Sequence, residues 1–515
     1  MPPARLSDRS YVVSTFYRIR LEPLGKVLEV AAGTPLQDLL FSYGVEFPCG
    51  GRGVCGGCRV KVLEGDVPVD EEHRRALERL GLHDPWRLAC RTRVTGDMTL
   101  EVGQFDTIIL ADSSPFRFRP QEGRAVAVDV GTTTLVAQLV DLRSGRVVAA
   151  ETALNPQARY GGDIISRITA AVQQGKADLL TRLLREAVAT LVQRLMAAAG
   201  GEAPQRILLA GNTVMHHLFC GLDLTPLAAY PFETPHGGSC SLPPALLGLP
   251  RSTEVLFLPI LGSFVGSDLL AGIVATGMTE SDRPRVLVDL GTNGEIVAGH
   301  RGRIVCASTA AGPAFEGTNI EMGMRATTGA ISSVQLRDGV PQYHVLGNVE
   351  PRGICGSGLI DAVAVFLERG DLDSGGRILR DEGRLPLTGT VSLTQKDVRE
   401  LQLAKSAIAT GMQILLEELD VAPAEVEQIY IAGAFGTFID LAHTRRIGLL
   451  PYPDEKIVKM GNTSLLGTKM LLFEDAAARA EEIRKVTRHI PLEGHPRFQD
   501  LFAENILFAP LQEEG

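Results

Sequence analysis

The chain has 515 residues, of which 45% are hydrophobic and 22% are charged, and it contains 55 glycines. This length predicts three or four domains, because a single hydrophobic core stops growing well below it. The formal net charge of −10 argues against a nucleic-acid-binding groove and favours a protein or a small molecule as partner.

Neither a secretion signal nor a membrane span is expected. Residues 1–8 lack the apolar run of a signal peptide, since Arg and Asp recur too soon. The longest apolar stretch, residues 255–278, is interrupted by Pro259, several glycines and Asp268, and so makes a poor membrane span. We therefore expect a cytoplasmic protein that does not enter a membrane, in which crowded cysteines indicate a metal site rather than disulfides.

The first part of the chain has the pattern of a small α+β domain. Residues 11–21 and 26–30 alternate apolar and polar side chains and predict a hairpin. Thr34 and Gly44 are suited to the start and end of a short helix. The elements expected after the hairpin are a helix over residues 35–43, a strand over residues 59–63 and a helix over residues 70–80.

Four cysteines follow the spacing of an iron–sulfur site. Cys49, Cys55 and Cys58 fall within ten residues that also hold five glycines, and Cys90 follows at a distance. Glycines allow such a loop to fold tightly over a small cluster and to present backbone N–H groups to its sulfides. The spacing resembles that of the adrenodoxin-like [2Fe–2S] ferredoxins, which implies a β-grasp domain with these four cysteines as ligands. A structural zinc site is the alternative, although zinc usually takes two separate Cys-x2-Cys pairs.

The sequence contains no second cluster signature. The remaining cysteines are scattered, and buried free thiols are expected at such positions. They are Cys220, Cys240, Cys306 and Cys355. A glycine-rich dinucleotide loop is also missing, so the electrons are expected to come from an external low-potential donor.

Residues 106–124 are predicted to be a tether. They contain Pro115 and Pro120 and have no helical or strand periodicity. Phe116 and Phe118 are expected to dock on a neighbouring surface.

A possible phosphate-binding hairpin follows the tether. Residues 125–130 form an apolar run that predicts a strand buried on both faces, with Asp129 near its end. The next residues combine a tight glycine turn with hydroxyl and backbone N–H groups that cradle phosphate oxygens. They are Gly131, Thr132, Thr133 and Thr134. Asp129 is expected to hold Mg²⁺ through its waters, because this ion keeps part of its hydration shell.

The same pattern returns 160 residues later. Residues 286–290 are again apolar, with Asp289 in the place of Asp129. The expected phosphate contacts here are Gly291, Thr292 and Asn293. One such hairpin is weak support, but two copies predict two similar half-domains that face each other across a nucleotide.

A third glycine-containing strand end completes the pattern. Residues 429–436 predict a strand that enters a turn with Gly433 and Gly436, suited to close approach of adenosine, and Gly312 lies in a small-residue loop expected to line the cleft. The three segments resemble the phosphate and adenosine motifs of the actin, sugar kinase and heat-shock chaperone ATPases over residues 124–510. The resemblance implies an α/β, ribonuclease H-like, duplicated ATPase fold that binds ATP with Mg²⁺, with Asp129 and Asp289 as the catalytic carboxylates. The expected domains are residues 1–105, the linker 106–124 and the half-domains 125–284 and 285–515.

Other segments carry weaker signals. Residues 155–168 are expected to form an ordered loop that leads into a helix. His216 and His217 are adjacent on a predicted helix, where they are expected to pack rather than share a metal. A helix that opens at the glycines of residues 353–363 is suited either to phosphate contact at its N-terminus or to tight helix packing at the hinge between the half-domains, and the hinge is the first choice. The tail is expected to be helical to about Val486 and then irregular.

Taken together, the chain resembles the reductive activators of corrinoid proteins, in which a [2Fe–2S] ferredoxin domain precedes an actin-like ATPase. The resemblance implies ATP-supported one-electron reduction of Co(II) corrinoid to methyl-accepting Co(I). The partner would be a corrinoid iron–sulfur protein or the corrinoid subunit of a methyltransferase. Some longer members carry an additional module that this chain lacks, which leaves a homodimer open.

Two alternatives use the same parts. One is a redox-sensing ATPase regulator that delivers no electron. The other is a small-molecule kinase or the activator of another low-potential enzyme, such as an acyl-CoA dehydratase, although such activators usually hold a [4Fe–4S] cluster between subunits.

Overall fold

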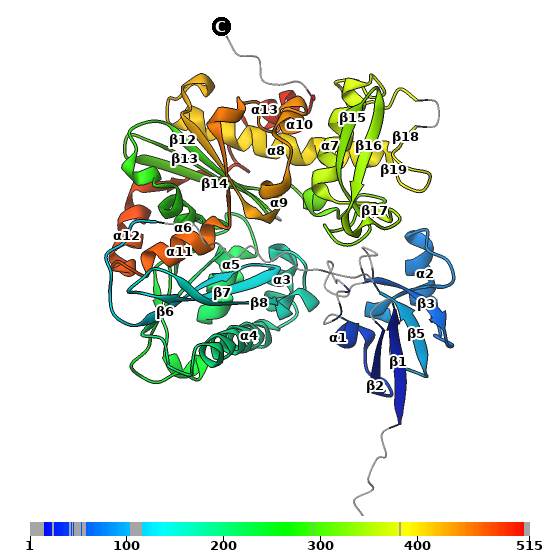
Figure 1. Cartoon of the computed structure of the whole chain (residues 1–515), viewed down its shortest axis with the longest axis horizontal. Coiled ribbons are helices and arrows are strands. Elements are labelled where there is room, and N and C mark those ends of the chain that lie inside the picture. The colour runs from blue at the N-terminus through cyan, green and yellow to red at the C-terminus, as the bar shows by residue number, and fades with distance from the viewer. Residues whose placement is uncertain are drawn as a thin grey trace, which may run out of the picture. The chain divides into compact units, whose positions relative to one another are not determined.

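The computed structural model describes residues 15–22, 25–40, 43, 45, 53, 58–102, 116–291, 293–380 and 383–508. The chain divides into two compact units (Figure 1). The first unit is Met1–Phe105 with Ala158–Gly162, and the second is Asp106–Gln157 with Asp163–Gly515.

The first unit contains a five-stranded sheet in the order β2-β1-β5-β3-β4. Its strands are β1 (Phe16–Glu22), β2 (Lys26–Ala31), β3 (Arg59–Glu64), β4 (Trp86–Leu88) and β5 (Met98–Glu101), and its helices are α1 (Leu36–Leu40) and α2 (Glu71–Arg79). β1 and β2 form the predicted antiparallel hairpin, while β5 runs parallel to β1. Helix α2 begins where the Asp70 carboxylate accepts a hydrogen bond from the His73 N–H at 2.7 Å. The mixed sheet with its helices is the predicted β-grasp arrangement.

The second unit begins with a six-stranded sheet in the order β10-β11-β9-β6-β7-β8. Its strands are β6 (Arg124–Val130), β7 (Thr134–Asp141), β8 (Val147–Leu154), β9 (Arg206–Gly211), β10 (Cys240–Ser241) and β11 (Glu254–Phe257). The helices of this half are α3 (Ile164–Val172), α4 (Ala177–Ala198), α5 (Thr213–Cys220) and α6 (Ser267–Thr276). Strands β6, β7 and β8 form an antiparallel meander, and β9 and β11 extend the sheet in parallel from β6.

A second six-stranded sheet repeats this plan in the order β21-β20-β12-β13-β14-β22. Its strands are β12 (Arg285–Leu290), β13 (Gly294–His300), β14 (Arg303–Thr309), β20 (Gln428–Ala432), β21 (Ile457–Gly461) and β22 (Thr487–His489). Strands β12, β13 and β14 form the meander, and β20 and β21 extend it in parallel from β12. The duplication predicted from the two hairpins is therefore confirmed in the order and direction of five strands of each sheet, whereas β10 and β22 are additions at opposite edges.

The second half also carries a smaller sheet, β16-β15-β17, and a two-stranded sheet, β18-β19. These strands are β15 (Ala330–Arg337), β16 (Val340–Val345), β17 (Gly353–Ile354), β18 (Arg384–Pro386) and β19 (Ser392–Thr394). The helices are α7 (Gly356–Glu368), α8 (Gln395–Glu418), α9 (Gly433–Phe438), α10 (Leu441–Arg446), α11 (Thr463–Leu471), α12 (Ala476–Val486) and α13 (Phe498–Glu504).

Helices α6 and α11 lie between the two large sheets (Figure 1). They share one hydrophobic cluster with β6 and β9 on one side and with β12 and β13 on the other. The helices approach so closely that a Cβ added to Gly467 of α11 would lie 1.8 Å from the Ala271 carbonyl oxygen of α6. This pair of helices therefore connects the two half-domains.

The hinge expected at residues 353–363 is wrong. Helix α7 packs against β15, and its buried side chains belong to a cluster formed only by the second half. The glycines at its start serve close packing, since a Cβ on Gly356 would lie 1.9 Å from the Phe315 oxygen and one on Gly358 would lie 2.2 Å from the Ile331 oxygen.

The prediction that the chain is irregular after about Val486 is also wrong. After α12 the chain adds β22 beside β14 in parallel, and α13 then packs on α8. The Ser406 hydroxyl of α8 donates to the Phe502 carbonyl at 2.6 Å, which fixes α13 in place.

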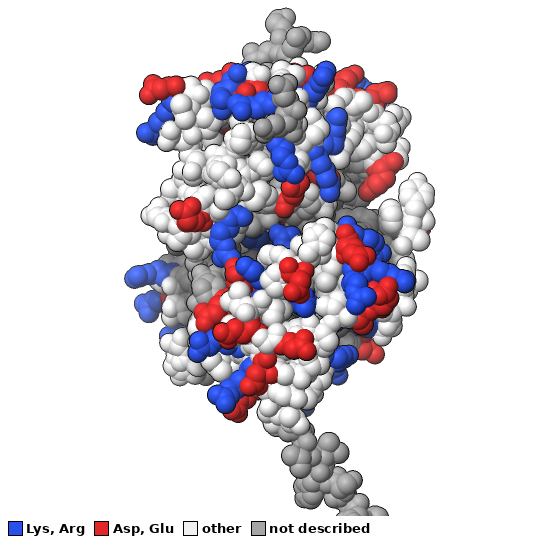
Figure 2. Space-filling view, turned by 90° about the vertical axis from the view of Figure 1, so that its right-hand side faces the viewer, with Lys and Arg blue, Asp and Glu red and all other residues white. Residues whose placement is uncertain are grey.

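None of the helices within the described ranges is long and apolar enough to cross a membrane. On the face shown in Figure 2, basic and acidic side chains are interspersed and form no continuous basic surface.

Candidate functional site

The first hairpin, formed by β6 and β7, has four residues (131–134) between its last two paired residues. Val130 pairs with Leu135, and the Gly131 N–H donates to the Thr134 oxygen at 3.1 Å. A Cβ at position 131 would lie only 2.5 Å from that oxygen, so the turn requires glycine.

The second hairpin is one residue shorter. Leu290 pairs with Gly294, and the Gly291 N–H donates to the Asn293 oxygen at 3.1 Å. Here a Cβ at position 291 would meet only the Asn293 oxygen, at 3.7 Å. Thr292 lies outside the described residues.

Three side chains from other segments hold the first loop. The Asn155 amide donates to the Gly131 oxygen at 2.9 Å, and the Asn212 amide donates to the Thr132 hydroxyl at 2.8 Å. The buried guanidinium of Arg167 donates to the Thr132 oxygen, and burial lowers its pKa to about 9. The segment 155–168, expected to be an ordered loop that leads into a helix, thus stabilises the hairpin through Asn155 and Arg167.

Three carboxylates from different elements are close enough to interact electrostatically. We call Asp129 of β6, Asp268 of α6 and Asp289 of β12 the carboxylate cluster. Burial raises the pKa of all three, and that of Asp268 and Asp289 reaches about 7 because the neighbouring carboxylates add repulsion. Both oxygens of Asp129 are hydrogen-bonded at 2.8 Å, one to the Asn462 amide and one to the Ser464 hydroxyl.

A divalent cation fits this donor set, because carboxylates that repel one another are relieved by a positive charge between them. Within the described part of the chain, no three His, Cys, Asp or Glu side chains are close enough to bind a metal directly.

Glu295 adds a fourth carboxyl group that the sequence analysis did not select. It lies directly opposite Asp289 across the second hairpin, where the first hairpin has Val136 opposite Asp129. Burial raises its pKa well above the usual value, and Asp268 and Asp289 raise it further. Asp268 was also missed as a site residue, having been considered only as an interruption of an apolar stretch.

The predicted adenosine segment is a strand, β20, followed directly by α9. Gly433 has a φ of +87°, and a Cβ there would lie 2.9 Å from the Asp289 Oδ1 atom, so the segment approaches the carboxylate cluster. Gly436 instead packs against Ile431 of β20, and a Cβ at Gly312 would meet no atom within 4 Å. Phe435 stacks on Phe315 with ring centroids 4.9 Å apart.

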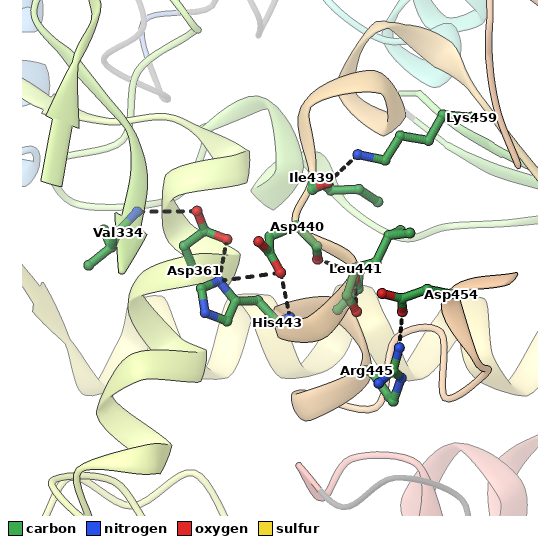
Figure 3. Close-up of polar contacts among 10 residues, drawn as sticks. Val334, Asp361, Ile439, Asp440, Leu441, His443, Arg445, Asp454 and Lys459 are labelled. Carbon is green, nitrogen blue, oxygen red and sulfur yellow. Dashed lines mark hydrogen bonds and ion pairs between the residues drawn. The ribbon is translucent and has the colours of Figure 1, made fainter. Parts of the chain in front are cut away.

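Helix α7 is tied to α10 by a pair formed from the buried Asp361 and the half-buried His443 (Figure 3). The His443 Nδ1 atom lies 2.8 Å from Asp361 Oδ1, and the Val334 N–H donates to Asp361 Oδ2 at 3.1 Å. Burial acts to lower the pKa of His443, but the hydrogen bond and the charge of Asp361 outweigh it and raise the pKa. The glycine-rich start of α7 is therefore part of a packed substructure.

In the first unit, the two described cysteines of the predicted cluster site lie together. The Cys58 and Cys90 Sγ atoms are 3.3 Å apart, and the Ala89 N–H donates to the Cys58 oxygen at 2.9 Å. Thiols at this separation fit ligation of one shared metal centre. Cys49 and Cys55 lie outside the described residues.

Three family models match consecutive parts of the chain. They are described as a 2Fe-2S iron-sulfur cluster binding domain (residues 19–95), the RACo middle region (residues 124–281) and the C-terminal domain of RACo, the ASKHA domain (residues 283–514). Corrinoid activation enzyme RamQ of Eubacterium limosum is 35% identical over 422 residues, which cover 74% of this chain and 70% of that protein. The chain belongs to the RACo family of reductive activators of corrinoid proteins.

Two further relatives agree with this family. The [Co(II) methylated amine-specific corrinoid protein] reductase of Methanosarcina barkeri is 27% identical over 399 residues, covering 71% of this chain and 72% of that protein. The solved structure of a reductive activator for corrinoid, iron-sulfur protein superposes with a TM-score of 0.65 at 26% identity, covering 95% of this chain and 98% of that one.

Each of the three matched regions of this RACo family member contains part of the candidate sites described above. The iron–sulfur match contains Cys49 to Cys90, the middle region contains the first hairpin and Asp268, and the C-terminal domain contains the second hairpin and α11. The match to a 2Fe-2S domain supports a [2Fe–2S] cluster, and the ASKHA match supports ATP binding.

The two adjacent histidines and the four scattered cysteines differ in how deeply they are buried. His216 and His217 are buried in α5, with the His216 ring edge-on to Phe257 at 5.1 Å, so their predicted packing role is confirmed. Cys306 and Cys355 are buried as expected. Cys220 and Cys240 are only half-buried, which corrects the expectation for these two thiols.

Proposed function

We propose that this protein uses ATP to drive single electrons from a [2Fe–2S] cluster onto the Co(II) corrinoid of a partner protein, producing Co(I). The observation that carries the proposal is the presence, on one chain, of a 2Fe-2S binding domain and of a RACo middle region and ASKHA domain that each contribute one hairpin and one of the interacting carboxylates Asp129 and Asp289. The names of the two relatives, which refer to corrinoid activation and to Co(II) corrinoid protein reduction, support the same substrate.

Each predicted residue has a place in this proposal. Asp129 and Asp289 hold hydrated Mg²⁺, with Asp268 and Glu295 beside them, and the glycines near the adenosine segment shape the pocket for the nucleoside. The proposed phosphate contacts are Gly131, Thr132, Thr133, Thr134, Gly291, Thr292 and Asn293. The proposed nucleoside-side positions are Gly312, Gly433 and Gly436. The proposed cluster ligands are Cys49, Cys55, Cys58 and Cys90.

When bound, the [2Fe–2S] cluster supplies one electron at a time and Mg²⁺ neutralises phosphate charge. Each cobalt gains one electron when Co(II) is reduced to Co(I). That electron comes from an external low-potential donor and passes through the N-terminal unit to the partner. Plant-type clusters have potentials near about −400 mV. Each further deficit of about 100 mV corresponds to roughly 2.3 kcal/mol for one electron, so an acceptor of lower potential requires an energy source such as ATP.

The two half-domains supply the mechanical part. Asp129 lies on β6 of the first half and Asp289 on β12 of the second, so one nucleotide bound between them draws both halves together. Helices α6 and α11 cross between the halves and carry that movement. The partner is a corrinoid iron–sulfur protein or a methyltransferase subunit, and a homodimer is compatible with the proposal.

The deciding experiment mixes reduced, cluster-loaded protein with Co(II) corrinoid protein, with and without ATP, and follows the Co(I) absorbance. We expect Co(I) only with ATP. Cys55→Ser is expected to remove electron transfer while leaving nucleotide binding intact. Asp289→Asn is expected to remove nucleotide binding, and with it ATP-dependent Co(I) formation, while the cluster still loads and is still reduced by the external donor. ATP-dependent activation by Asp289→Asn at the wild-type rate would contradict the assignment of the nucleotide site. ATP hydrolysis that responds to cluster oxidation without any Co(I) would instead favour a redox-sensing regulator.

A further inference from the structure

The segment that enters the ATPase unit is fixed to the end of helix α11. Phe116, Phe118 and Phe473, here named the aromatic anchor, pack with ring centroids 5.4 Å apart (116–118), 5.4 Å (116–473) and 4.6 Å (118–473). The Gln121 amide donates to the Phe473 oxygen at 2.8 Å, and the Lys469 Nζ atom lies 5.6 Å from the centre of the Phe116 ring. The expected docking of the two phenylalanines is therefore confirmed, and their docking surface follows α11 directly.

The opposite end of the same helix holds the nucleotide-site carboxylate. Asn462 caps α11 and, with Ser464, binds both oxygens of Asp129 at 2.8 Å. Between its two ends, Gly467 presses α11 against Ala271 of α6, and α6 carries Asp268 in its first turn. A helix of nine residues is about 13.5 Å long and moves as one rigid rod.

We propose that α11 couples the nucleotide site to the chain segment that leads to the iron–sulfur domain. Asn462 and Ser464 are positioning residues at one end of the helix, and the aromatic anchor lies at the other end. The inference rests on the proposed function. A hydrated cation or phosphate that binds Asp129 must share the carboxylate oxygens of Asp129 with α11, or displace the Asn462 amide and the Ser464 hydroxyl that bind them. The helix then shifts as a unit, and Phe473 transmits the shift to the chain segment that leads to the iron–sulfur domain.

The first test uses full-length, cluster-loaded protein with Phe116→Ala and Phe118→Ala combined. We expect ATP hydrolysis within about twofold of wild type, whereas the stimulation of Co(I) formation by ATP falls at least about fivefold, the lower end of typical coupling between two sites. Phe118→Leu keeps an apolar contact with Phe473 and is expected to restore most of the stimulation. Tyr230→Ala, which removes an aromatic ring that is 76% exposed and remote from the anchor in sequence, is the matched control and is expected to behave as wild type.

The second test needs no electron acceptor and no variant of the anchor. Hydrogen exchange of the peptide covering residues 116–123 is measured in wild type and in Asp129→Asn, with and without Mg²⁺ and a non-hydrolysable ATP analogue. We expect the analogue to change the exchange rate of this peptide in wild type and to leave it unchanged in Asp129→Asn.

The outcomes separate the inference from the function on which it rests. If wild type forms no Co(I) with ATP, the proposed function fails. If wild type does form Co(I) and the double variant keeps full stimulation, the coupling role of α11 is overturned while the function stands. If the double variant does not fold, an analogue-independent exchange rate in wild type overturns the coupling and an analogue-dependent one supports it.

Discussion

At the scale of single residues, we expect the charge state of the carboxylate cluster to affect both nucleotide binding and the stability of the fold. The pKa of Asp289 is raised from 3.8 to about 7 by burial and by its acidic neighbours. Between these two pH values the unfolded chain ionises while the folded protein keeps the proton, so the folded state loses stability as pH rises through about 7. Below about pH 4 both states are protonated and this loss disappears.

Asp289→Asn is therefore expected to stabilise the metal-free protein at pH 8, by an amount on the order of a few kcal/mol, and to have much less effect at pH 5. Thermal unfolding of the ATPase unit at the two pH values in the presence of a chelator measures this. With Mg²⁺ and ATP present at pH 8, wild type is expected to become the more stable of the two proteins, because only wild type binds the nucleotide well. Asp282→Asn, at an exposed position, is the control. Equal stability of wild type and Asp289→Asn at pH 8 would rule out a raised pKa at this position.

The two hairpin glycines provide a matched pair of substitutions. Gly131→Ala places a Cβ 2.5 Å from the Thr134 oxygen, so the loop backbone must shift, whereas Gly291→Ala meets only an ordinary contact at 3.7 Å. Forcing a group into such a space costs about 1–3 kcal/mol. We expect Gly131→Ala to weaken ATP binding at least about fivefold and Gly291→Ala to change it less than twofold, as measured by calorimetric titration. An equal loss in both variants would show that the two turns contact phosphate through a feature other than their backbone geometry.

The strands and hairpins around the carboxylates were predictable from the sequence, but the full cluster was not. Asp129 and Asp289 each end an apolar strand, and their repetition at a fixed place in the pattern marks them. Asp268 has no such context, because it belongs to the first turn of α6. The start of that helix is held in place by hydrogen bonds between Ser267 and Gly211 at the end of β9, which no local pattern reveals. Glu295 was hidden for another reason, since its importance depends on pairing opposite Asp289 rather than on a motif of its own.

At the scale of elements, the α6–α11 crossing determines how the two halves are joined. Gly467→Ala would place a Cβ 1.8 Å from the Ala271 oxygen and force the helices apart. We expect the free energy of unfolding of the ATPase unit to fall by about 1–3 kcal/mol or more, together with weaker ATP binding, because Asn462 and Ser464 move with α11. Chemical denaturation checks the first effect and nucleotide titration the second. Gly238→Ala, whose Cβ would meet no atom within 4 Å, is the control and should unfold as wild type does. A fully stable Gly467→Ala protein would mean that the helices can separate without cost.

The errors at this scale have a common physical cause. The glycines of α7 and of α11 both permit close packing, but only the tertiary structure tells which of the two helices lies between the half-domains, and the sequence analysis selected the wrong one. Strand β22 has three residues and is defined by its pairing with β14 rather than by any local pattern. Long helices such as α4 and α8 are different, since their burial pattern follows from the spacing of apolar residues in their own sequence.

At the scale of the whole molecule, the covalent connection between the two units is what distinguishes the chain from a separate ferredoxin and a separate ATPase. A domain tethered to its acceptor site has an effective concentration of about a millimolar, whereas free copies in an assay meet at their bulk concentration. At about 1 µM protein, transfer within one chain is therefore favoured about a thousandfold over transfer between chains. The aromatic anchor adds a fixed starting point for that connection on α11.

This reasoning predicts the behaviour of two inactive variants when they are mixed. Cys90→Ser lacks a cluster ligand but keeps the nucleotide site, and Asp289→Asn keeps the ligands but lacks the carboxylate. At about 1 µM each, with Co(II) corrinoid protein, a reductant and ATP, we expect the mixture to form Co(I) at no more than about one hundredth of the wild-type rate, and the rate to rise with the concentration of both variants. Wild type at half the total protein concentration is the control. Activity restored to a large fraction at 1 µM, and independent of concentration, would instead require that the iron–sulfur domain of one copy serves the ATPase unit of another within a stable dimer.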